Sequence, residues 1–290
     1  MTVKIGFIGI GLMGLPMCKR LLAAGYSLVI WNRTPAKCAE LAALGAIVCE
    51  NPAEVAKSAD LLMMCLADAK AITDIVFGEN GIISISKPGL RLIDFSSTDP
   101  TTTKNAATKL LECSGIYWID CPVSGGVVGA ETGQLVMMAG GREEDVEFIR
   151  PFVSPLGIRL TYMGALGAGQ VTKICNQLIV AANALLIAEA VSLATAAGVD
   201  ANALASALAG GFADSKPFQI LAPRMAAKQF EPVQWRVQTL LKDLDNAVQL
   251  ANGVKVPIQV AQKARELMQQ HASDGHATED LSSVIEIYSC

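Results

Sequence analysis

Three glycines near the start of the chain have the spacing of a dinucleotide-binding turn. Gly9, Gly11 and Gly14 follow the apolar run Val3–Ile8 and precede a helical stretch that ends at Gly25. In such a turn the first glycine permits a tight bend, the second lets a pyrophosphate approach the backbone, and the third lets the helix pack on the strand. An ordinary glycine turn is the alternative, which the position between strand and helix disfavours. The predicted phosphate site comprises Gly9, Gly11, Leu12, Met13 and Gly14.

The segment after the second predicted strand bears on cofactor choice. Enzymes that use NAD usually carry an acidic residue here, which binds the ribose hydroxyls. This chain has Asn32, Arg33 and Thr34 instead. No carboxylate repels a 2′-phosphate, and a guanidinium and a hydroxyl are available to bind it. An exposed surface arginine is the alternative, but the segment favours NADP(H) over NAD(H).

Lys173 is the lysine best suited to proton transfer. It stands in an otherwise apolar helical segment that begins GAGQVTKICNQ, with Asn176 one turn further on the same face. A lysine in a largely buried helix must be paired or functional, although one near a helix start can also extend its ammonium group to water. The segment predicts that Lys173 is the proton donor.

A second glycine-rich segment has the composition of an anion site. The sequence DCPVSGG, Asp120–Gly126, directly follows a predicted strand. Small residues with free backbone N–H groups after a strand can surround a carboxylate, and the Ser124 hydroxyl adds a donor. A plain glycine turn explains the same residues equally well, so both interpretations stay open for Ser124, Gly125 and Gly126.

Several other chemistries lack the residues that they need. None of the four tyrosines is followed by a lysine four positions later, so the YxxxK arrangement of short-chain dehydrogenases is absent. The two histidines, His271 and His276, lie near the C-terminus with no cysteine nearby, which disfavours a His/Cys zinc site. We also do not expect a Ser-His-Asp triad. We expect no metal. The eight cysteines form no CxxC pair and are typical of reduced thiols in the cytosol.

The elements that must position these residues change in kind along the chain. Short apolar runs alternate with amphipathic helical stretches up to Met163, which is typical of a parallel sheet with helices on both faces. The runs are Val3–Ile8, Leu28–Trp31, Leu61–Leu66, Leu92–Phe95, Tyr117–Ile119, Leu135–Ala139 and Leu160–Met163. Long Ala- and Leu-rich segments with helical spacing follow Gly169.

These patterns predict an α/β Rossmann domain followed by an all-α domain. We expect a doubly wound, mostly parallel sheet in residues 1–163 and a helical substrate and dimerisation domain in residues 164–290. A long helix from about Gln170 to Ala197 should join them. Its nearly all-round apolarity predicts burial on several sides, within the domain or against another subunit.

Composition excludes some partners. The 290 residues are 52% hydrophobic and carry a net charge of -4, which gives no general attraction to nucleic acid or anionic membranes. Glycines interrupt the apolar N-terminus, unlike a signal peptide. The apolar stretch Leu178–Val199 has spanning length but carries Asn183 and Glu189, which favours a buried helix. We expect a cytoplasmic protein without nucleic-acid or membrane partners.

Four segments together resemble the β-hydroxyacid dehydrogenase family. They are FIGIGLMGLPM (Phe7–Met17), DCPVSGG (Asp120–Gly126), GAGQVTKICNQ (Gly167–Gln177) and KDLDNA (Lys242–Ala247). Their order and spacing cover nearly the whole chain. The resemblance implies a Rossmann domain joined by a long helix to an all-helical domain, with the active site in the cleft between them. From the apolar helix we expect a homodimer or homotetramer.

The resemblance also implies roles for individual residues. Lys173 would be the catalytic lysine, and Asn176 would help hold the substrate hydroxyl or carbonyl. The substrate carboxylate would be bound by Ser124, Gly125 and Gly126. Lys242, with Asp243 beside it, would contact substrate and cofactor, and Leu66 and Ser97 would line the cofactor cleft. Related imine reductases replace the lysine, so its presence favours aldehyde or ketone chemistry.

We therefore expect an NADPH-preferring reductase of a small carboxylated aldehyde. The segment Gly210–Gln219 resembles that of the tartronate semialdehyde reductases, which favours reduction of tartronate semialdehyde to D-glycerate. Succinic semialdehyde, glyoxylate, methylmalonate semialdehyde, 3-hydroxyisobutyrate and L-serine stay open as substrates. A non-catalytic dinucleotide-binding redox sensor is the rival from another class, but it would not need Lys173 and Asn176 beside an anion site.

Overall fold

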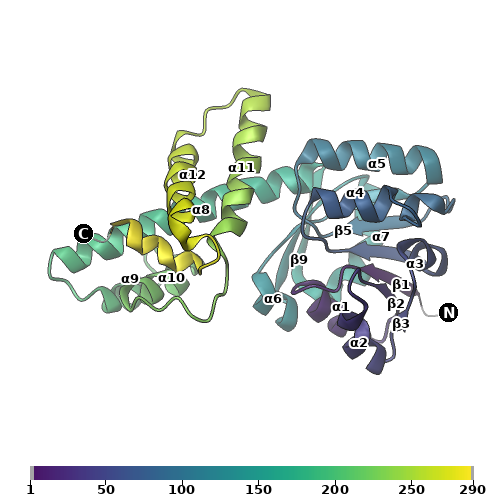
Figure 1. Ribbon diagram of the computed structural model, residues 1–290, viewed down its shortest axis with the longest axis horizontal. Helices are drawn as coiled ribbons and strands as arrows, with labels where there is room; N and C mark the ends of the chain where they lie inside the picture. The colour runs from purple at the N-terminus through teal and green to yellow at the C-terminus, as the bar shows by residue number, and fades with distance from the viewer. Residues whose placement is uncertain (1–2, 289–290) are drawn as a thin grey trace. The chain divides into compact units, whose positions relative to one another are not determined.

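The computed structural model of the protein describes residues 3–288 and separates the chain at Lys173 into two units, Met1–Lys173 and Ile174–Cys290. The first unit holds all nine strands of the described residues, and the second is built from helices (Figure 1). The fold class predicted from the alternating pattern, a Rossmann domain followed by a helical domain, is confirmed. The described cysteines are all free thiols, and Cys290 lies outside the described residues.

The sheet of the first unit has the strand order β3-β2-β1-β4-β5-β6-β8-β7, with β9 beside β8. The strands are β1 (Lys4–Ile8), β2 (Ser27–Trp31), β3 (Ile47–Val48), β4 (Leu61–Met64), β5 (Arg91–Asp94), β6 (Tyr117–Asp120), β7 (Val123–Ser124), β8 (Leu135–Gly140) and β9 (Gly157–Gly164). The pairs from β3 to β6 are parallel, whereas β8 runs antiparallel to β6 and β7. The first six strands thus have the order of a dinucleotide-binding sheet.

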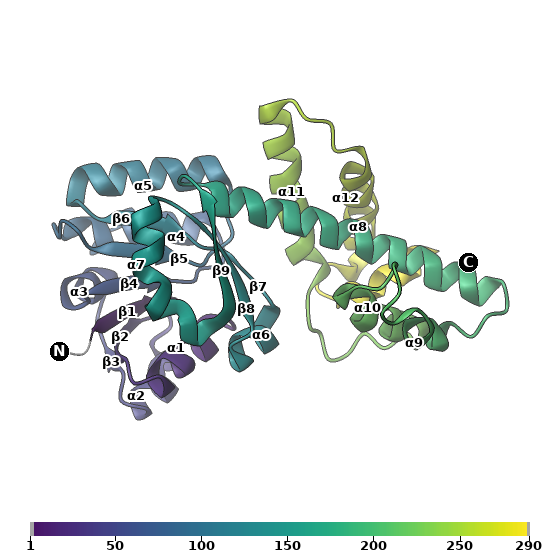
Figure 2. The same cartoon turned by 180° about the vertical axis from the view of Figure 1, so that it is seen from behind.

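Helices cover both faces of this sheet, because alternate strand side chains belong to different cores. On β1, Ile5 and Phe7 join the core with α1 and α7, whereas Ile8 joins the core with α3, α4 and α5 (Figures 1 and 2). The helices are α1 (Gly14–Ala23), α2 (Ala39–Ala43), α3 (Pro52–Ser58), α4 (Ala69–Phe77), α5 (Pro100–Ser114), α6 (Gly126–Thr132) and α7 (Glu143–Val153), with the 3-10 turns η1 (Pro35–Cys38), η2 (Ile82–Ser84) and η3 (Ser154–Leu156).

Local sequence signals begin and end these helices. The Asp99 carboxylate accepts hydrogen bonds from the backbone N–H groups of Thr101 and Thr102, and Pro100 occupies the first turn of α5. Gly115 ends that helix in the left-handed region at φ 71°. Two strands escaped the sequence analysis, β3 and β7, because each has only two residues and shows no measurable periodicity.

The second unit packs its helices around one core. They are the long helix α8 (Ala168–Ala196), whose first residues belong to the first unit, α9 (Leu204–Leu208), α10 (Lys216–Ala226), α11 (Val237–Val254) and α12 (Gln259–His271), with η4 (Ala201–Ala203), the π-helical turn η5 (Ala272–His276) and η6 (Leu281–Tyr288). The predicted long helix is confirmed within two residues at its start. The core joins Ala184 and Ala188 of α8 to Leu240 and Leu244 of α11.

Within its own unit α8 does not bury all of its apolar surface, so the predicted burial on several sides needs another subunit and stays a prediction. One face is buried, but Ile179, Leu186 and Leu193, spaced seven residues apart, are 58%, 63% and 71% exposed. The apolar sequence of a helix shows that its surface can be buried, but it does not show whether the same chain or another subunit packs against that surface. By length and hydropathy α8 is also the one described helix that could span a membrane, a criterion that core helices of soluble proteins also meet.

Candidate functional site

The glycine turn after β1 has the geometry that its sequence predicted. Gly9 has φ 100°, and a Cβ atom there would lie 2.4 Å from the carbonyl oxygen of Cys65. A Cβ atom on Gly14 would lie 2.0 Å from the carbonyl oxygen of Gly9, so the start of α1 needs a glycine to pack on the turn. A Cβ atom on Gly11 would meet nothing within 4 Å. The room above Gly11 and the amides at the start of α1 fit a pyrophosphate group.

Asn32 joins the end of β2 to this turn. Its side-chain oxygen accepts a hydrogen bond of 2.9 Å from the backbone N–H of Ile10, and its amide nitrogen donates to the carbonyl oxygen of Thr34. Arg33 and Thr34 are exposed. The exposed Lys37 on η1 follows four residues after Arg33, and the sequence analysis did not single it out. From Asn32 to Lys37 the chain carries two cations and no carboxylate.

Leu66 and Ser97 follow the ends of the next two strands. The backbone N–H of Leu66 donates to the hydroxyl of Ser96 over 2.9 Å, and the Leu66 side chain lies 2.8 Å from where a Cβ atom on Gly9 would be. Ser97 is half-buried between the buried residues Ser96 and Thr98. The first unit therefore brings the glycine turn, Asn32, Leu66 and Ser97 together at the carboxyl ends of neighbouring parallel strands, where dinucleotides bind in such sheets.

Two buried carboxylates lie at the same edge of the sheet. Asp94 ends β5 and Asp120 ends β6, and the two are register partners with no exposed surface. Burial raises the pKa of Asp94 to about 7, opposed by hydrogen bonds from Ser96 and reinforced by the charge of Asp120. Burial also raises the pKa of Asp120, against backbone hydrogen bonds from Gly167 and Gln170 that lower it. Neither residue was singled out for a role in the site from the sequence.

The proposed anion segment lies between β7 and α6. Ser124 belongs to the two-residue strand β7, which pairs with β8. Gly125 and Gly126 have φ values of 136° and 62°, which residues with a Cβ atom rarely adopt. A Cβ atom on Gly126 would meet nothing within 4 Å. Both interpretations of this segment, an anion site and a glycine turn, are compatible with this backbone.

A cavity of about 1000 Å³ opens beside the glycine turn in the first unit. Ile10, Gly11 and Leu12 line it from the turn, with α1, η1, α2 and α6 forming the other walls. Lys37 belongs to this lining, whereas Arg33, Leu66 and Ser97 do not. The cavity therefore shares the phosphate turn with the predicted cofactor site and extends along α1 instead of toward the ends of β4 and β5.

The second unit brings together three of the predicted substrate residues. The side-chain amide of Asn176 donates to Gln177 over 2.8 Å, and the amide of Gln177 donates to the Asp243 carboxylate on α11. The Lys242 ammonium nitrogen lies 3.4 Å from the other Asp243 oxygen. Asp243 is 5% exposed, so its carboxylate orients neighbouring side chains and offers little surface to a ligand. Gln177, which links α8 to α11, was missed because its partner lies 66 residues away.

Lys173 lies in the second turn of α8 and is half-buried. Three residues before it, Gln170 is fully buried and hydrogen-bonded to Ser96, Thr98 and Asp120. Three residues after it, Asn176 is half-buried on the same helix. Residues three apart on a helix lie on neighbouring parts of one face, so both polar neighbours share the side of Lys173.

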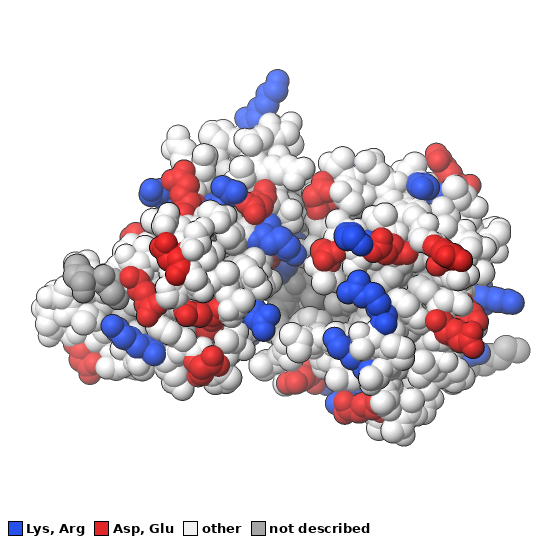
Figure 3. All heavy atoms as spheres, viewed as in Figure 1, with Lys and Arg blue, Asp and Glu red and all other residues white. Residues whose placement is uncertain are grey.

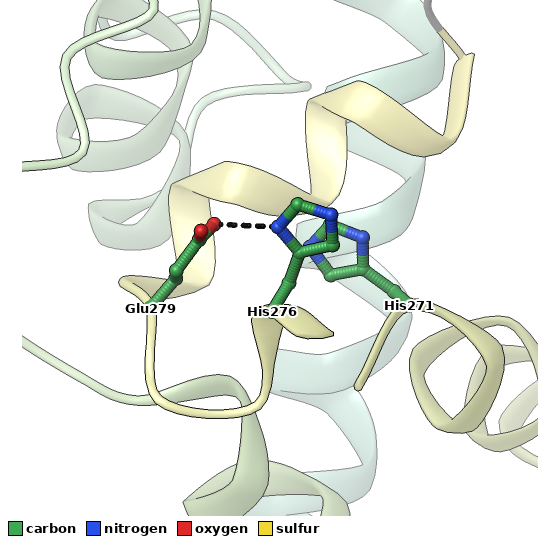
Figure 4. A group of neighbouring side chains, drawn as sticks. All are labelled: His271, His276 and Glu279. Atoms are coloured by element: carbon green, nitrogen blue, oxygen red, sulfur yellow. Dashed lines mark ion pairs between the residues drawn. The ribbon is translucent and has the colours of Figure 1, made fainter. Parts of the chain in front are cut away.

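His271, His276 and Glu279 form a separate cluster, in which three potential ligand atoms lie within 4.8 Å of one another (Figure 4). The two rings stack in parallel, with centroids 4.4 Å apart and planes 6° apart. Because the lone pair of an imidazole lies in its ring plane, parallel stacked rings cannot both point at one ion. His271, the last residue of α12, bonds the Ser283 hydroxyl on η6, and His276 pairs with Glu279 three residues later, so the cluster holds the end of α12 against η6.

Charged side chains show no clustering by sign on the face drawn in Figure 3. Lysine and arginine alternate there with aspartate and glutamate over both units. The net charge of -4 agrees with this mixture.

Comparison with known proteins identifies the family. Residues 4–164 match the family described as "NAD binding domain of 6-phosphogluconate dehydrogenase", and residues 167–288 match "NAD-binding of NADP-dependent 3-hydroxyisobutyrate dehydrogenase". The chain is 35% identical over 284 residues to 2-hydroxy-3-oxopropionate reductase of Escherichia coli strain K12, covering 98% of this chain and 96% of that protein.

Two solved structures are similar along the whole chain. Mycobacterium tuberculosis 3-hydroxyisobutyrate dehydrogenase with L-serine has a TM-score of 0.87 at 28% identity, covering 100% of both chains. Psf3 in complex with NADP+ and 2-OPP also has a TM-score of 0.87, at 25% identity, covering 98% of this chain and 100% of that chain. The resemblance carried by four short segments is therefore confirmed over the full length: the chain belongs to the β-hydroxyacid dehydrogenase family and is an NAD(P)-dependent dehydrogenase.

Proposed function

We propose that the protein is an NADPH-preferring reductase that converts tartronate semialdehyde (2-hydroxy-3-oxopropanoate) to D-glycerate. The observation that carries this proposal is the 35% identity to 2-hydroxy-3-oxopropionate reductase, which extends over both units. The proposed division of labour assigns NADP binding to residues 1–163 and substrate binding and dimerisation to residues 164–290. We also propose that the protein works in the cytoplasm as a homodimer or homotetramer.

The preference for NADPH is supported by the end of β2. A 2′-phosphate carries charge that Arg33 can bind with two parallel N–H groups, and Thr34 adds a hydroxyl donor. Lys37, four residues further, adds a second exposed cation on η1. The similar Psf3 structure is a complex with NADP+. Gly9, Gly11 and Gly14, with Leu12 and Met13, would hold the pyrophosphate, and Leu66 and Ser97 would line the remaining cofactor surface.

Catalysis is assigned to α8. NADPH supplies a hydride to the carbonyl carbon of the aldehyde, which leaves negative charge on the carbonyl oxygen. The Lys173 ammonium group stabilises that charge and then donates its Nζ proton to the oxygen. Asn176, one turn on, donates a hydrogen bond to the same oxygen without carrying charge. The product is a hydroxyl group, and Lys173 regains its proton from water.

The substrate carboxylate is assigned to the loop before α6. Ser124 would donate its hydroxyl hydrogen, and Gly125 and Gly126 their backbone N–H groups, to the two carboxylate oxygens. Lys242 would add a positive charge on the substrate side. Its proximity to Asp243 at 3.4 Å supports this role, because the buried carboxylate limits the rotamers available to the lysine.

A second candidate is the oxidation of a β-hydroxy acid such as 3-hydroxyisobutyrate or L-serine. The observation that favours it is the TM-score of 0.87 to a 3-hydroxyisobutyrate dehydrogenase structure that contains L-serine. This reaction uses the same residues in the reverse direction, with Lys173 accepting the hydroxyl proton. Reduction of succinic semialdehyde or glyoxylate stays as a further alternative.

One assay separates these candidates. NADPH and NADH oxidation would be followed at 340 nm over a panel of tartronate, succinic and methylmalonate semialdehydes and glyoxylate, and NADP+ reduction with 3-hydroxyisobutyrate and L-serine. We expect the highest kcat/KM with NADPH and tartronate semialdehyde. A higher value for another member of the panel reassigns the substrate. Binding of NADPH without turnover of any compound would instead favour the redox-sensor class.

A further inference from the structure

We propose that Asp120 and Gln170 are positioning residues that fix the first turn of α8, and with it Lys173, against the segment that carries Ser97. The inference rests on the proposed role of Lys173 as proton donor. In this proposal, two fully buried polar residues affect the reaction by positioning Lys173, and neither contacts the substrate. All the residues concerned, from Ser96 to Lys173, belong to the first unit.

The Asp120 carboxylate binds the start of α8 with both oxygens. One oxygen accepts a hydrogen bond of 2.7 Å from the backbone N–H of Gly167, and the other accepts one of 2.9 Å from the backbone N–H of Gln170. α8 begins at Ala168, so these amides are among those that have no acceptor within the helix. The end of β6 therefore supplies the cap that a residue next to the helix would ordinarily provide, and its negative charge opposes the positive end of the helix.

The Gln170 side chain extends the same link to the end of β5. Its amide nitrogen donates to the carbonyl oxygen of Ser96 over 2.9 Å, and its amide oxygen accepts from the backbone N–H of Thr98 over 3.1 Å. The two bonds are made to the residues on either side of Ser97. A displacement of the first turn of α8 therefore moves Lys173 and the Ser97 segment together or breaks these bonds.

Two glycines let the helix approach the sheet closely enough for these bonds. A Cβ atom on Gly140 would lie 2.6 Å from the Asp120 carboxylate and 2.8 Å from the backbone nitrogen of Gly169. A Cβ atom on Gly169 would lie 2.3 Å from the carbonyl oxygen of Met138. The first turn of α8 thus packs directly on the ends of β6 and β8. Lys173 is one turn further on, so its backbone is set by this contact.

Asp120 is the carboxylate of the pair whose hydrogen bonds favour the ionised form, because both of its oxygens accept backbone N–H groups. Its register partner Asp94 accepts a hydrogen bond from Ser96 with one oxygen, and its other oxygen is buried without a hydrogen-bond partner among the described residues. Two adjacent buried carboxylates do not both ionise readily. Burial raises the pKa of both carboxylates, but only Asp120 accepts hydrogen bonds from the amides at the start of α8, so these amides favour the negative charge on Asp120.

The first test compares Asp120→Asn with the matched variant Asp94→Asn. Asparagine has one acceptor oxygen, so at position 120 its NH2 group would face a backbone N–H that also donates. We expect hydrogen exchange of the peptide containing residues 167–170 to accelerate at least tenfold in Asp120→Asn and to stay within about twofold of wild type in Asp94→Asn. Unchanged exchange in Asp120→Asn overturns the proposal without any reference to activity.

The second test uses kinetics. A misplacement of about 1 Å can cost on the order of 10²-fold in rate, so we expect Asp120→Asn to lower kcat by about 10- to 100-fold. The Kd for NADPH, from fluorescence titration, should change less than threefold. The isotope effect with deuterated NADPH should rise, because hydride transfer becomes rate-limiting. Equal losses in kcat and in NADPH affinity would indicate general structural damage and overturn the proposal.

A double-mutant cycle separates this inference from the proposed function. If Asp120 acts through Lys173, Asp120→Asn should lower kcat in the wild-type background but by less than twofold in Lys173→Ala. Equal losses in both backgrounds overturn the positioning role. High activity of Lys173→Ala by itself contradicts the proposed function instead. Should Asp120→Asn not fold, Gln170→Met removes the bonds to Ser96 and Thr98 while keeping the backbone bond to Asp120, and the same cycle applies.

Discussion

The backbone N–H of Ile10 donates a hydrogen bond of 2.9 Å to the side-chain oxygen of Asn32, so the glycine turn and the end of β2 are joined directly. The same asparagine donates to the carbonyl oxygen of Thr34. Arg33 lies between these two contacts. The backbone of Arg33 is therefore fixed relative to the turn, although its side chain is exposed. We expect substitutions of Arg33 and of Asn32 to affect cofactor binding differently.

Replacing Arg33 by alanine should affect NADPH selectively. A charge-assisted hydrogen bond contributes about 1.5 to 3 kcal/mol, which corresponds to about 10- to 150-fold in affinity. We expect the KM for NADPH to rise within this range and the KM for NADH to change less than threefold. Steady-state kinetics with both cofactors measure the difference. A wild-type enzyme that prefers NADH, or equal losses with both cofactors, would contradict the assignment.

Replacing Asn32 by alanine should affect both cofactors alike. The variant loses the bonds to Ile10 and Thr34, which place the phosphate turn and not the 2′-phosphate site. We expect the KM values for NADPH and NADH to rise by similar factors, about 5- to 30-fold, since a hydrogen bond to a buried donor is worth about 1 to 2 kcal/mol. Arg33→Ala is the matched control. Selective loss of NADPH binding in Asn32→Ala would place its side chain on the 2′-phosphate.

Replacing Lys173 by alanine should abolish most turnover without loss of cofactor binding. Removal of a general acid typically costs about 10²- to 10⁴-fold in rate. Lys173→Arg should restore little, because a guanidinium keeps the charge but does not release its proton. Single-turnover NADPH oxidation and NADPH titration measure the two quantities. More than a tenth of wild-type turnover in Lys173→Ala would make the lysine structural, with Lys242 as the next candidate.

Replacing Asp94 by asparagine should change how stability depends on pH. The folded pKa of Asp94 is about 7, above its unfolded value of 3.8, so the folded state binds the proton more tightly. Its stabilisation is complete below pH 3.8 and is lost as the pH rises to about 7, by at most about 1.4 kcal/mol per pH unit. We expect wild type to lose stability relative to Asp94→Asn between pH 5 and pH 7 in urea unfolding. A constant difference would show that Asp94 is already ionised.

The exposed apolar row on α8 predicts self-association. Ile179, Leu186 and Leu193 present an apolar stripe to solvent on a helix that buries another face in the core of its own unit. Covering such a stripe with a second copy removes apolar area from water, worth about 25 cal/mol per Å². We expect light scattering at micromolar concentration to give at least a dimer, and Leu186→Lys to lower the mass. Val260→Lys, which changes a 72% exposed valine on α12, is the control. A monomeric wild type would contradict this assembly.

The sequence alone determined the features that depend on local spacing. The Gly9, Gly11 and Gly14 turn, the buried strands and the long helix α8 follow from patterns within a few turns of chain, because backbone conformation and side-chain periodicity are local properties. The same holds for Arg33 as a candidate cation, since the absence of an acidic residue at the end of β2 is visible in the sequence.

Only the tertiary structure decided what holds these features in place. Asp120 meets Gly167 and Gln170 across 47 and 50 residues, and Gln177 meets Asp243 across 66. No periodicity predicts such pairs, because the partner of a side chain at a strand end is the group that the tertiary fold places next to it. Burial made the difference for these polar groups: out of water, each donor and acceptor needs a partner, and the nearest one belongs to a distant part of the chain.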